Sequence, residues 1–201
     1  MKILKNTLLT YILFLTGNIV IAQNLSKGDH LINASIGLSN LVRPQGFETT
    51  LPPLVFQFEY ALTNRITVGT YLGISRSLFE DQGYFSLYKY PYNIEHQTYH
   101  WTATNILAGI KGAYHFGELL KTTEKLDLYI GATFGYNIVA VKIKQTEGSI
   151  NLNPYLTPEP KTKAMGGVFF GTRYYLTKKI ALMGEIGYST AIFQVGISYK
   201  L

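Results

Sequence analysis

The 201-residue chain contains no cysteine and a single tryptophan, and only 15% of its residues are charged. Without cysteine it can form neither a disulfide framework nor a thiolate site, and a zinc site would need histidine and carboxylate ligands alone. After residue 22 it also lacks any apolar run long enough for a membrane-spanning helix. Its 16 Tyr, 11 Phe and 19 Gly favour β structure, and its length favours a single domain.

The one long apolar stretch lies at the start of the chain. Lys2 and Lys5 precede an apolar segment over 8–20, which ends in residues suited to cleavage. We expect residues 1–22 to be a signal peptide and residues 23–201 to form the mature domain. A transmembrane anchor is the alternative, and the shortness of the stretch and its polar interruptions disfavour it.

The charge balance gives no sign of a nucleic-acid partner. The formal net charge of +6 falls by two once Lys2 and Lys5 are removed. The remaining basic residues are scattered along the chain and form no cluster or RNA-binding aromatic motif. We therefore predict that the protein binds no nucleic acid.

Alternation with a period of two dominates the rest of the chain, as expected for strands whose successive side chains point to opposite faces. In the clearest segment, residues 128, 130, 132, 134, 136 and 138 are apolar and alternate with polar residues, glycine and Tyr129. The alternation predicts eight strands, over 31–40, 54–62, 66–79, 98–116, 126–143, 164–176, 180–188 and 191–201.

The polarity of the two faces indicates which one is inside. One face is almost uniformly aliphatic and aromatic, while the other collects Gly, Ser, Thr, Gln and charged residues. A soluble barrel points its apolar face inward, whereas a barrel in lipid reverses this polarity. We predict an all-β fold, an eight-stranded antiparallel up-and-down transmembrane β-barrel of the outer-membrane type. A soluble sandwich or barrel is the alternative, because alternation alone leaves the inner face open.

The connections between these segments alternate in length. Residues 63–65 and 177–179 form tight turns, whereas 41–53, 80–97 and 144–163 are long and rich in turn-forming residues. Membrane barrels have short periplasmic turns and longer extracellular loops. The pattern therefore predicts that both termini face the periplasm.

Three motifs carry a resemblance to a known family: Gly171-Thr-Arg-Tyr-Tyr-Leu176, Gly184-Glu-Ile-Gly-Tyr188 and a closing strand with apolar Phe193, Val195, Ile197, Tyr199 and Leu201. On these motifs and the hairpin pattern, residues 28–201 resemble the small outer-membrane β-barrel proteins typified by OmpX and the membrane domain of OmpA. The resemblance implies a location in the outer membrane of a Gram-negative bacterium, with its lipid as surroundings. It also implies that the barrel-assembly machinery binds the closing strand by strand pairing. Members usually end in Phe, and this chain ends in Leu201.

Four ionisable residues share the predicted interior near the short-turn ends of the strands: Glu59, Lys111, Arg173 and Glu185. An unpaired charge in a dry lumen is expensive, so we expect these side chains to pair with one another. Arg173 and Glu185 flank a tight turn and are predicted to be direct or diagonal partners on neighbouring strands, close enough to contact each other. We favour a structural plug, because side chains can fill an eight-stranded barrel. A small gated pore is the alternative.

One predicted surface loop and its stem concentrate aromatic residues, namely Tyr84, Phe85, Tyr88, Tyr90, Tyr92, Tyr99 and Trp101. Aromatic side chains are effective binding anchors, so this segment is a candidate surface for an extracellular ligand. The alternative, which we favour, is an aromatic girdle with hairpin ends that project past the bilayer.

No catalytic, cofactor or metal site stands out. His96 and His100 are four residues apart, with Ser77, Ser86 and Glu95 nearby in sequence, but no nucleophile motif surrounds them. A lipid-modifying barrel enzyme is thus the least favoured alternative. We predict a monomeric, non-enzymatic protein with a structural or cell-surface interaction role.

Overall fold

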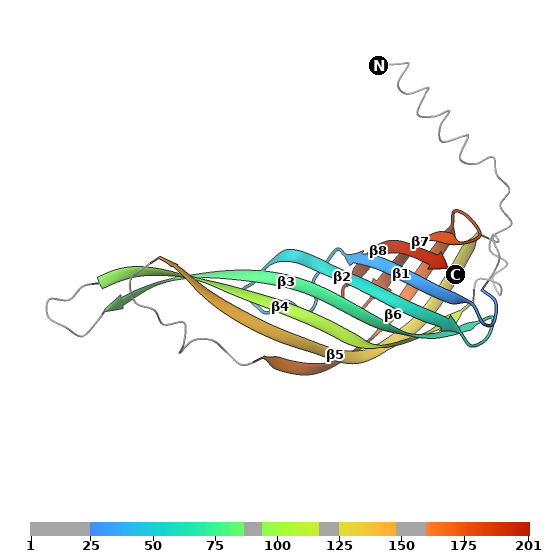
Figure 1. Ribbon diagram of the computed structural model, residues 1–201, viewed down its shortest axis with the longest axis horizontal. Coiled ribbons are helices and arrows are strands. Elements are labelled where there is room, and N and C mark those ends of the chain that lie inside the picture. The colour runs from blue at the N-terminus through green and yellow to red at the C-terminus, as the bar shows by residue number, and fades with distance from the viewer. Residues whose placement is uncertain (1–24, 87–93, 117–124, 148–159) are drawn as a thin grey trace, which may run out of the picture.

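The computed structural model describes residues 25–86, 94–116, 125–147 and 160–201 (Figure 1). The segments with alternating polar and apolar residues form eight strands. The strands are β1 (His30–Gly37), β2 (Glu48–Ala61), β3 (Ile66–Ser86), β4 (Ile94–His115), β5 (Leu126–Glu147), β6 (Lys161–Tyr175), β7 (Ile180–Gly187) and β8 (Phe193–Lys200).

Each strand pairs antiparallel with its neighbours in sequence, and β8 pairs with β1 to close the barrel. In the pairing of β1 with β8, Leu31 lies opposite Lys200 at one end and Gly37 lies opposite Gln194 at the other. The predicted fold class, an eight-stranded antiparallel barrel, is confirmed. Within the residues that the structure describes, no helix is long and apolar enough to cross a membrane.

The outward face is apolar and the inward face is polar, as the alternation predicts. Phe56, Leu72 and Val168 expose 62%, 62% and 66% of their surface, whereas Asn33 and Arg173 expose none. Exposed aliphatic surface in water costs about 25 cal/mol per Å². The outward face is therefore built for a surrounding of lipid.

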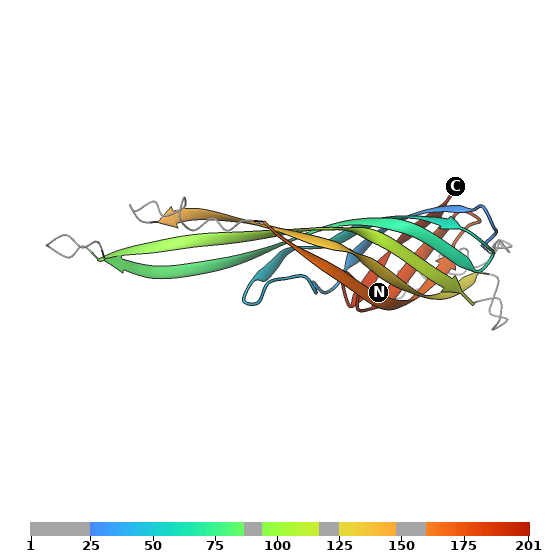
Figure 2. The same cartoon turned by 90° about the horizontal axis from the view of Figure 1, so that it is seen from below.

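The strands differ greatly in length. β1, β7 and β8 have 8 residues each, whereas β3, β4 and β5 have 21 or 22. At about 3.4 Å per residue, the long strands reach roughly 70 Å. Figures 1 and 2 show them continuing as a three-stranded sheet far beyond the closed barrel.

The polarity of this sheet reverses at one row of residues. Ile74, Ile106 and Ile138 lie side by side on β3, β4 and β5 and form the last apolar row on the outward face. Beyond them the outward face is mostly polar, although Leu78 and Ala140 also lie on it. Its polar residues are Arg76, Glu80, His100, Thr102, Lys142 and Lys144. The opposite face, polar within the barrel, becomes apolar there, with Phe79, Trp101, Val139, Val141 and Ile143. We call residues 75–86, 94–105 and 139–147 the blade.

The blade corrects the expected loops. The predicted loop 80–97 is largely strand, since β3 and β4 leave only residues 87–93 between them, and the predicted loop 144–163 is strand at both ends, since β5 reaches Glu147 and β6 begins at Lys161. The predicted loop 41–53 is also shorter, because β2 begins at Glu48. The predicted strands end at residues 79, 98 and 143, a few residues past the row at which the polarity reverses, because the segments beyond them are rich in turn-forming residues, but backbone pairing continues wherever neighbouring strands keep register.

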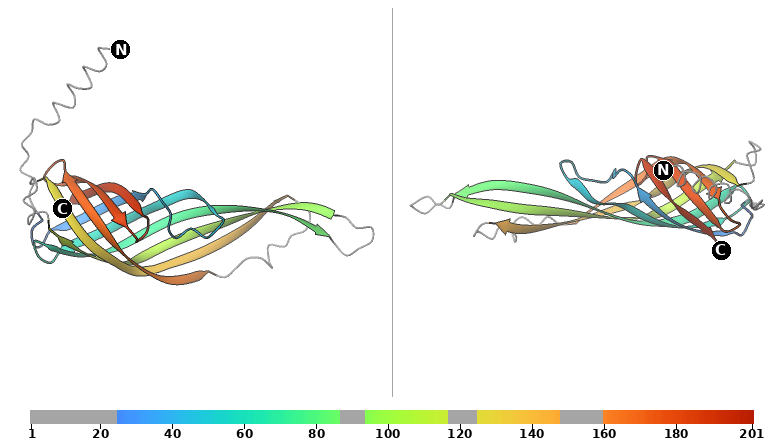
Figure 3. Two further views of the ribbon diagram at one scale, coloured as in Figure 1. Left: turned by 180° about the vertical axis from the view of Figure 1, so that it is seen from behind. Right: turned by 90° about the horizontal axis from the view of Figure 1, so that it is seen from above.

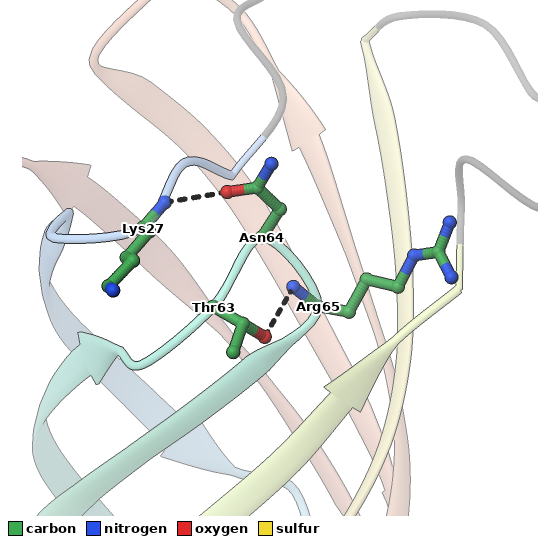
Figure 4. Close-up of a pocket in the computed structure, with 4 residues that line it drawn as sticks. All are labelled: Lys27, Thr63, Asn64 and Arg65. Atoms are coloured by element: carbon green, nitrogen blue, oxygen red, sulfur yellow. Dashed lines mark hydrogen bonds between the residues drawn. The ribbon is translucent and has the colours of Figure 1, made fainter.

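The two tight turns at the opposite end are confirmed and use the same device. The hydroxyl of Thr63 accepts a hydrogen bond from the backbone N–H of Arg65 at 3.1 Å (Figure 4) and a second from that of Ile66 at 3.0 Å. Thr177 does the same in the turn between β6 and β7. The Asn64 side chain additionally accepts the backbone N–H of Lys27 at 2.9 Å and so attaches the chain before β1 to this turn.

Candidate functional site

The interior residues singled out from the sequence lie together in the lumen. Glu59, Lys111, Arg173 and Glu185 come from β2, β4, β6 and β7, and their exposures are 1%, 4%, 0% and 6%. All four have odd numbers, and the period of two directs odd-numbered residues of these strands inward. The barrel thus encloses four side chains that carry formal charges.

Glu59 is the centre of one half of the cluster. Its Oε1 accepts hydrogen bonds from an Arg173 guanidinium nitrogen and from the Asn33 amide, both at 2.7 Å. Its Oε2 accepts the Thr67 hydroxyl at 3.2 Å. Charge-assisted hydrogen bonds of this kind offset the cost of burying a carboxylate.

Lys111 connects the two carboxylates of the cluster. Its ammonium group forms a short ion pair with Glu185 and lies 3.4 Å from Glu59 Oε1. It also donates to the Gln57 side-chain oxygen at 2.7 Å. The Tyr129 hydroxyl donates to the same Glu185 oxygen at 2.9 Å, so Glu185 is bound from two sides.

Arg173 and Glu185 are diagonal partners on neighbouring strands, as expected, but the contact expected between them is wrong. The register places Arg173 opposite Met183 and Glu185 opposite Gly171, which offsets the two residues along their strands. Arg173 instead reaches across the lumen to Glu59, and Glu185 binds Lys111. In a closed barrel a long side chain can contact residues of the opposite wall. Such contacts cannot be predicted from the pairing of neighbouring strands.

A further set of contacts extends the cluster, and its members could not be selected from the sequence. His115 Nε2 lies 3.1 Å from the Thr67 hydroxyl, and His115 Nδ1 lies 2.9 Å from Asp127 Oδ2. Asp127 Oδ2 in turn lies 3.6 Å from Arg173. With Glu59, these residues form a closed ring of polar contacts. All of them stand at strand positions that the period of two directs inward, but many other residues stand at such positions too.

The arrangement is suited to filling the lumen. Three carboxylates face two permanent cations and one imidazole at short range, so the charges largely balance within the cluster. The Tyr129 ring packs 4.5 Å from the Arg173 guanidinium carbon. Within the described segments, no group of three or more His, Cys, Asp and Glu side chains could hold a metal ion.

The aromatic residues singled out from the sequence do not form one exposed set. Tyr84 and Phe85 belong to the end of β3, whereas Tyr88, Tyr90 and Tyr92 lie outside the described residues. Tyr99 is 3% exposed on β4. Trp101 is half-buried on the inner face of the blade, opposite Phe79. Tyr99 and Trp101 therefore pack within the blade.

Two of the residues considered for an enzyme, His100 and Ser77, lie on opposite faces of the blade. His100 lies on the outer face of the blade, with Nε2 3.4 Å from Glu80. Ser77 is fully buried on the inner face and accepts a hydrogen bond from Asn40 at 3.4 Å. A hydroxyl and an imidazole on opposite faces of one sheet cannot act as nucleophile and base.

The closing strand of the barrel is β8. Phe193, Val195, Ile197 and Tyr199 point outward and are exposed, while the backbone pairs with β7 and β1. Leu201 donates its backbone N–H to the His30 carbonyl at 3.0 Å just past the strand. Figure 3 shows the chain ending at the short-turn side of the barrel.

A closed eight-stranded barrel with an apolar belt outside and paired charges inside is a β-barrel of the outer-membrane type. Similar solved structures include the N-terminal barrel of OprF from Pseudomonas aeruginosa, with 13% identity, coverage of 87% of this chain and 98% of that chain, and a TM-score of 0.47. They also include Ail of Yersinia pestis in complex with the heparin analogue sucrose octasulfate, with 11% identity, 87% and 99% coverage, and a TM-score of 0.47.

The NMR structure of outer membrane protein W from E. coli has 14% identity, covers 88% of this chain and 99% of that chain, and has a TM-score of 0.41. No protein-family model matches the chain, and no curated protein matches it. The assignment of the fold rests on the strand pairing of this chain itself.

Proposed function

We propose that this protein is a non-enzymatic barrel in the outer membrane of a Gram-negative bacterium that presents the blade as a cell-surface interaction element. The observation that carries the proposal is the unequal length of the strands. A tilted strand needs about 9–11 residues to span a bilayer. β3, β4 and β5 have 21 or 22 residues, so roughly half of each is surplus to membrane crossing.

The filled lumen supports an interaction role over a pore. Glu59, Lys111, Arg173 and Glu185 join strands on different sides of the barrel through buried ion pairs. An open path would require these pairs to separate inside a low-dielectric interior, which is costly. We further propose that the protein is a monomer. Its other partners are outer-membrane lipid around the apolar belt and the assembly machinery, which binds β8.

The proposal is tested by removing the blade hairpin. Ser77 and Ala103 are direct partners on β3 and β4 and belong to the same hydrogen-bonded set of pairs as Arg65 and His115. An Asn-Gly turn that replaces residues 78–102 therefore closes a two-residue hairpin in the same register. Cells that display the wild-type or the shortened protein are treated with a membrane-impermeant crosslinker, and the captured extracellular molecules are identified. We expect the shortened barrel to fold and its specific capture to disappear.

A milder variant separates binding from folding. Lys142→Glu with Lys144→Glu changes only the outer face of the blade, where both side chains are exposed. Capture that is equal for the wild type and both variants contradicts the interaction role. The proposed lack of enzymatic activity is tested by lipid A mass spectra, which we expect to stay unchanged on deletion and overexpression.

A further inference from the structure

A cavity of about 760 Å³ lies where the blade leaves the barrel. Parts of β5 and β6 and residues 41–45, which follow β1, form most of its lining. Small-molecule sites typically occupy about 300–1,000 Å³. Its lining includes Asn137 and Val139, which flank Ile138 of the last lipid-facing row. The cavity therefore lies at the level where the apolar belt ends.

One part of the lining is apolar. Val42, Val139, Val141 and Met165 line the cavity and are half-buried. Val139 and Val141 belong to the inner face of the blade, and Val42 and Met165 also pack against the buried cluster of Val55, Tyr71 and Leu107. An acyl chain could pack against these apolar side chains.

The other part of the lining is cationic. Arg43, Lys161 and Lys163 line the same cavity, and among the residues that the structure describes no Asp or Glu does. Lys163 lies opposite Asn137 and Lys161 opposite Val139, so both lysines stand beside the apolar wall. Within the described chain, none of the three cations forms an ion pair. Their charges are thus available to an anion.

We propose that this cavity binds a single-chain amphiphile with an anionic headgroup, of which a long-chain carboxylate is the simplest. The acyl chain packs on Val139, Val141 and Met165. The carboxylate accepts hydrogen bonds from the cations. Since Val139 and Met165 lie on the inner face of the wall and Ile138 lies on its lipid face, the occupant enters from the extracellular water. This inference is independent of whether the outer face of the blade binds a partner.

The test uses the full-length protein in zwitterionic phospholipid nanodiscs and a diazirine-bearing tetradecanoate as the probe. After photolysis, mass spectrometry locates the label. We expect labelling at Val139, Val141 or Met165 that excess tetradecanoate displaces and that tetradecanol or butyrate does not, because the site needs both the chain and the charge. Equal competition by tetradecanol, or label confined to the outward face, overturns the proposal.

Matched variants test the role of the cations. Lys161→Gln with Lys163→Gln is expected to weaken tetradecanoate competition by about tenfold or more, which corresponds to about 1.4 kcal/mol. Lys142→Gln with Lys144→Gln removes the same charge from the other face of β5 and is expected to leave competition unchanged. An equal loss in both pairs means a bulk charge effect and contradicts the site. Displacement by added anionic phospholipid but not by tetradecanoate assigns the cavity to membrane lipid and also contradicts it.

Discussion

Glu59 and Arg173 lie on β2 and β6, on opposite walls of the barrel, and their side chains meet in the lumen at 2.7 Å. β2 and β6 are four strands apart in either direction around the ring of eight. The ion pair therefore braces the barrel across its diameter. Both side chains are almost fully buried, so each depends on the other for compensation of its charge.

Arg173→Met is expected to lower the free energy of unfolding by about 3–5 kcal/mol, because it leaves Glu59 as a buried charge without its main partner. Equilibrium unfolding in urea with lipid vesicles measures the change. Lys142→Met removes an exposed cation from β5 and serves as the control, with an expected change within about 0.5 kcal/mol. A loss below about 1 kcal/mol for Arg173→Met would show that the brace is unimportant.

The coupling of the same pair is accessible through a double-mutant cycle. Glu59→Gln alone leaves Arg173 without a full charge partner, whereas Glu59→Gln in an Arg173→Met background removes a carboxylate that is already uncompensated. The second change should therefore cost less than the first, with a coupling of about 0.5–3 kcal/mol. Strictly additive losses would mean that the two residues act independently.

The barrel is expected to be closed to ions, because the ring of contacts through Glu59, Thr67, His115, Asp127 and Arg173 and the adjacent Lys111–Glu185 pair occupy the lumen. Recordings in planar lipid bilayers measure this directly. We expect no stable open level for the wild type. Stable conductance that Arg173→Ala alters would favour the gated pore and contradict the plug.

Most of the barrel could be predicted from the sequence because the period of two is a local property. Each strand shows its own inner and outer face, and the tight turns at Thr63 and Thr177 depend only on nearby residues. The membership of the charged cluster followed from the same parity. Its pairing did not, because the contact between Glu59 and Arg173 exists only once β8 has closed onto β1.

The blade could not be predicted from alternation with one fixed polarity. Up to Ile74, Ile106 and Ile138 the apolar residues face lipid, and beyond this row most of them face inward, with Leu78 as an exception, as in a sheet surrounded by water. The alternation of Val139, Val141 and Ile143 with Ala140 and Lys142 carried the predicted strand past this reversal to residue 143. The prediction stopped there, and at residues 79 and 98, because the segments beyond were assigned to loops rich in turn-forming residues.

The position of the membrane follows from this reversal and can be tested with two substitutions on the same face of β4. Ile110 is 61% exposed within the apolar belt, and Thr102 lies beyond the Ile106 row. Arginine on a lipid-facing strand costs about 2–4 kcal/mol at the bilayer midplane and about 0–1 kcal/mol near the interface. Ile110→Arg should therefore destabilise the folded barrel in vesicles far more than Thr102→Arg, and equal losses would place the boundary elsewhere.

Gly171 tests the packing that holds Tyr129 against the charged cluster. A Cβ atom on Gly171 would lie 2.2 Å from the Tyr129 ring, so Gly171→Ala must displace the ring and with it the hydrogen bond from Tyr129 to Glu185. We expect a loss of about 1–3 kcal/mol in unfolding free energy, as for other overpacked interiors. Gly112 on β4 is the matched control, because the nearest atom to its added Cβ is 3.9 Å away. Gly112→Ala should be neutral or slightly stabilising, since it restricts the unfolded chain without a clash. If both substitutions cost the same, the loss reflects glycine replacement in strands and Tyr129 is not held by close packing.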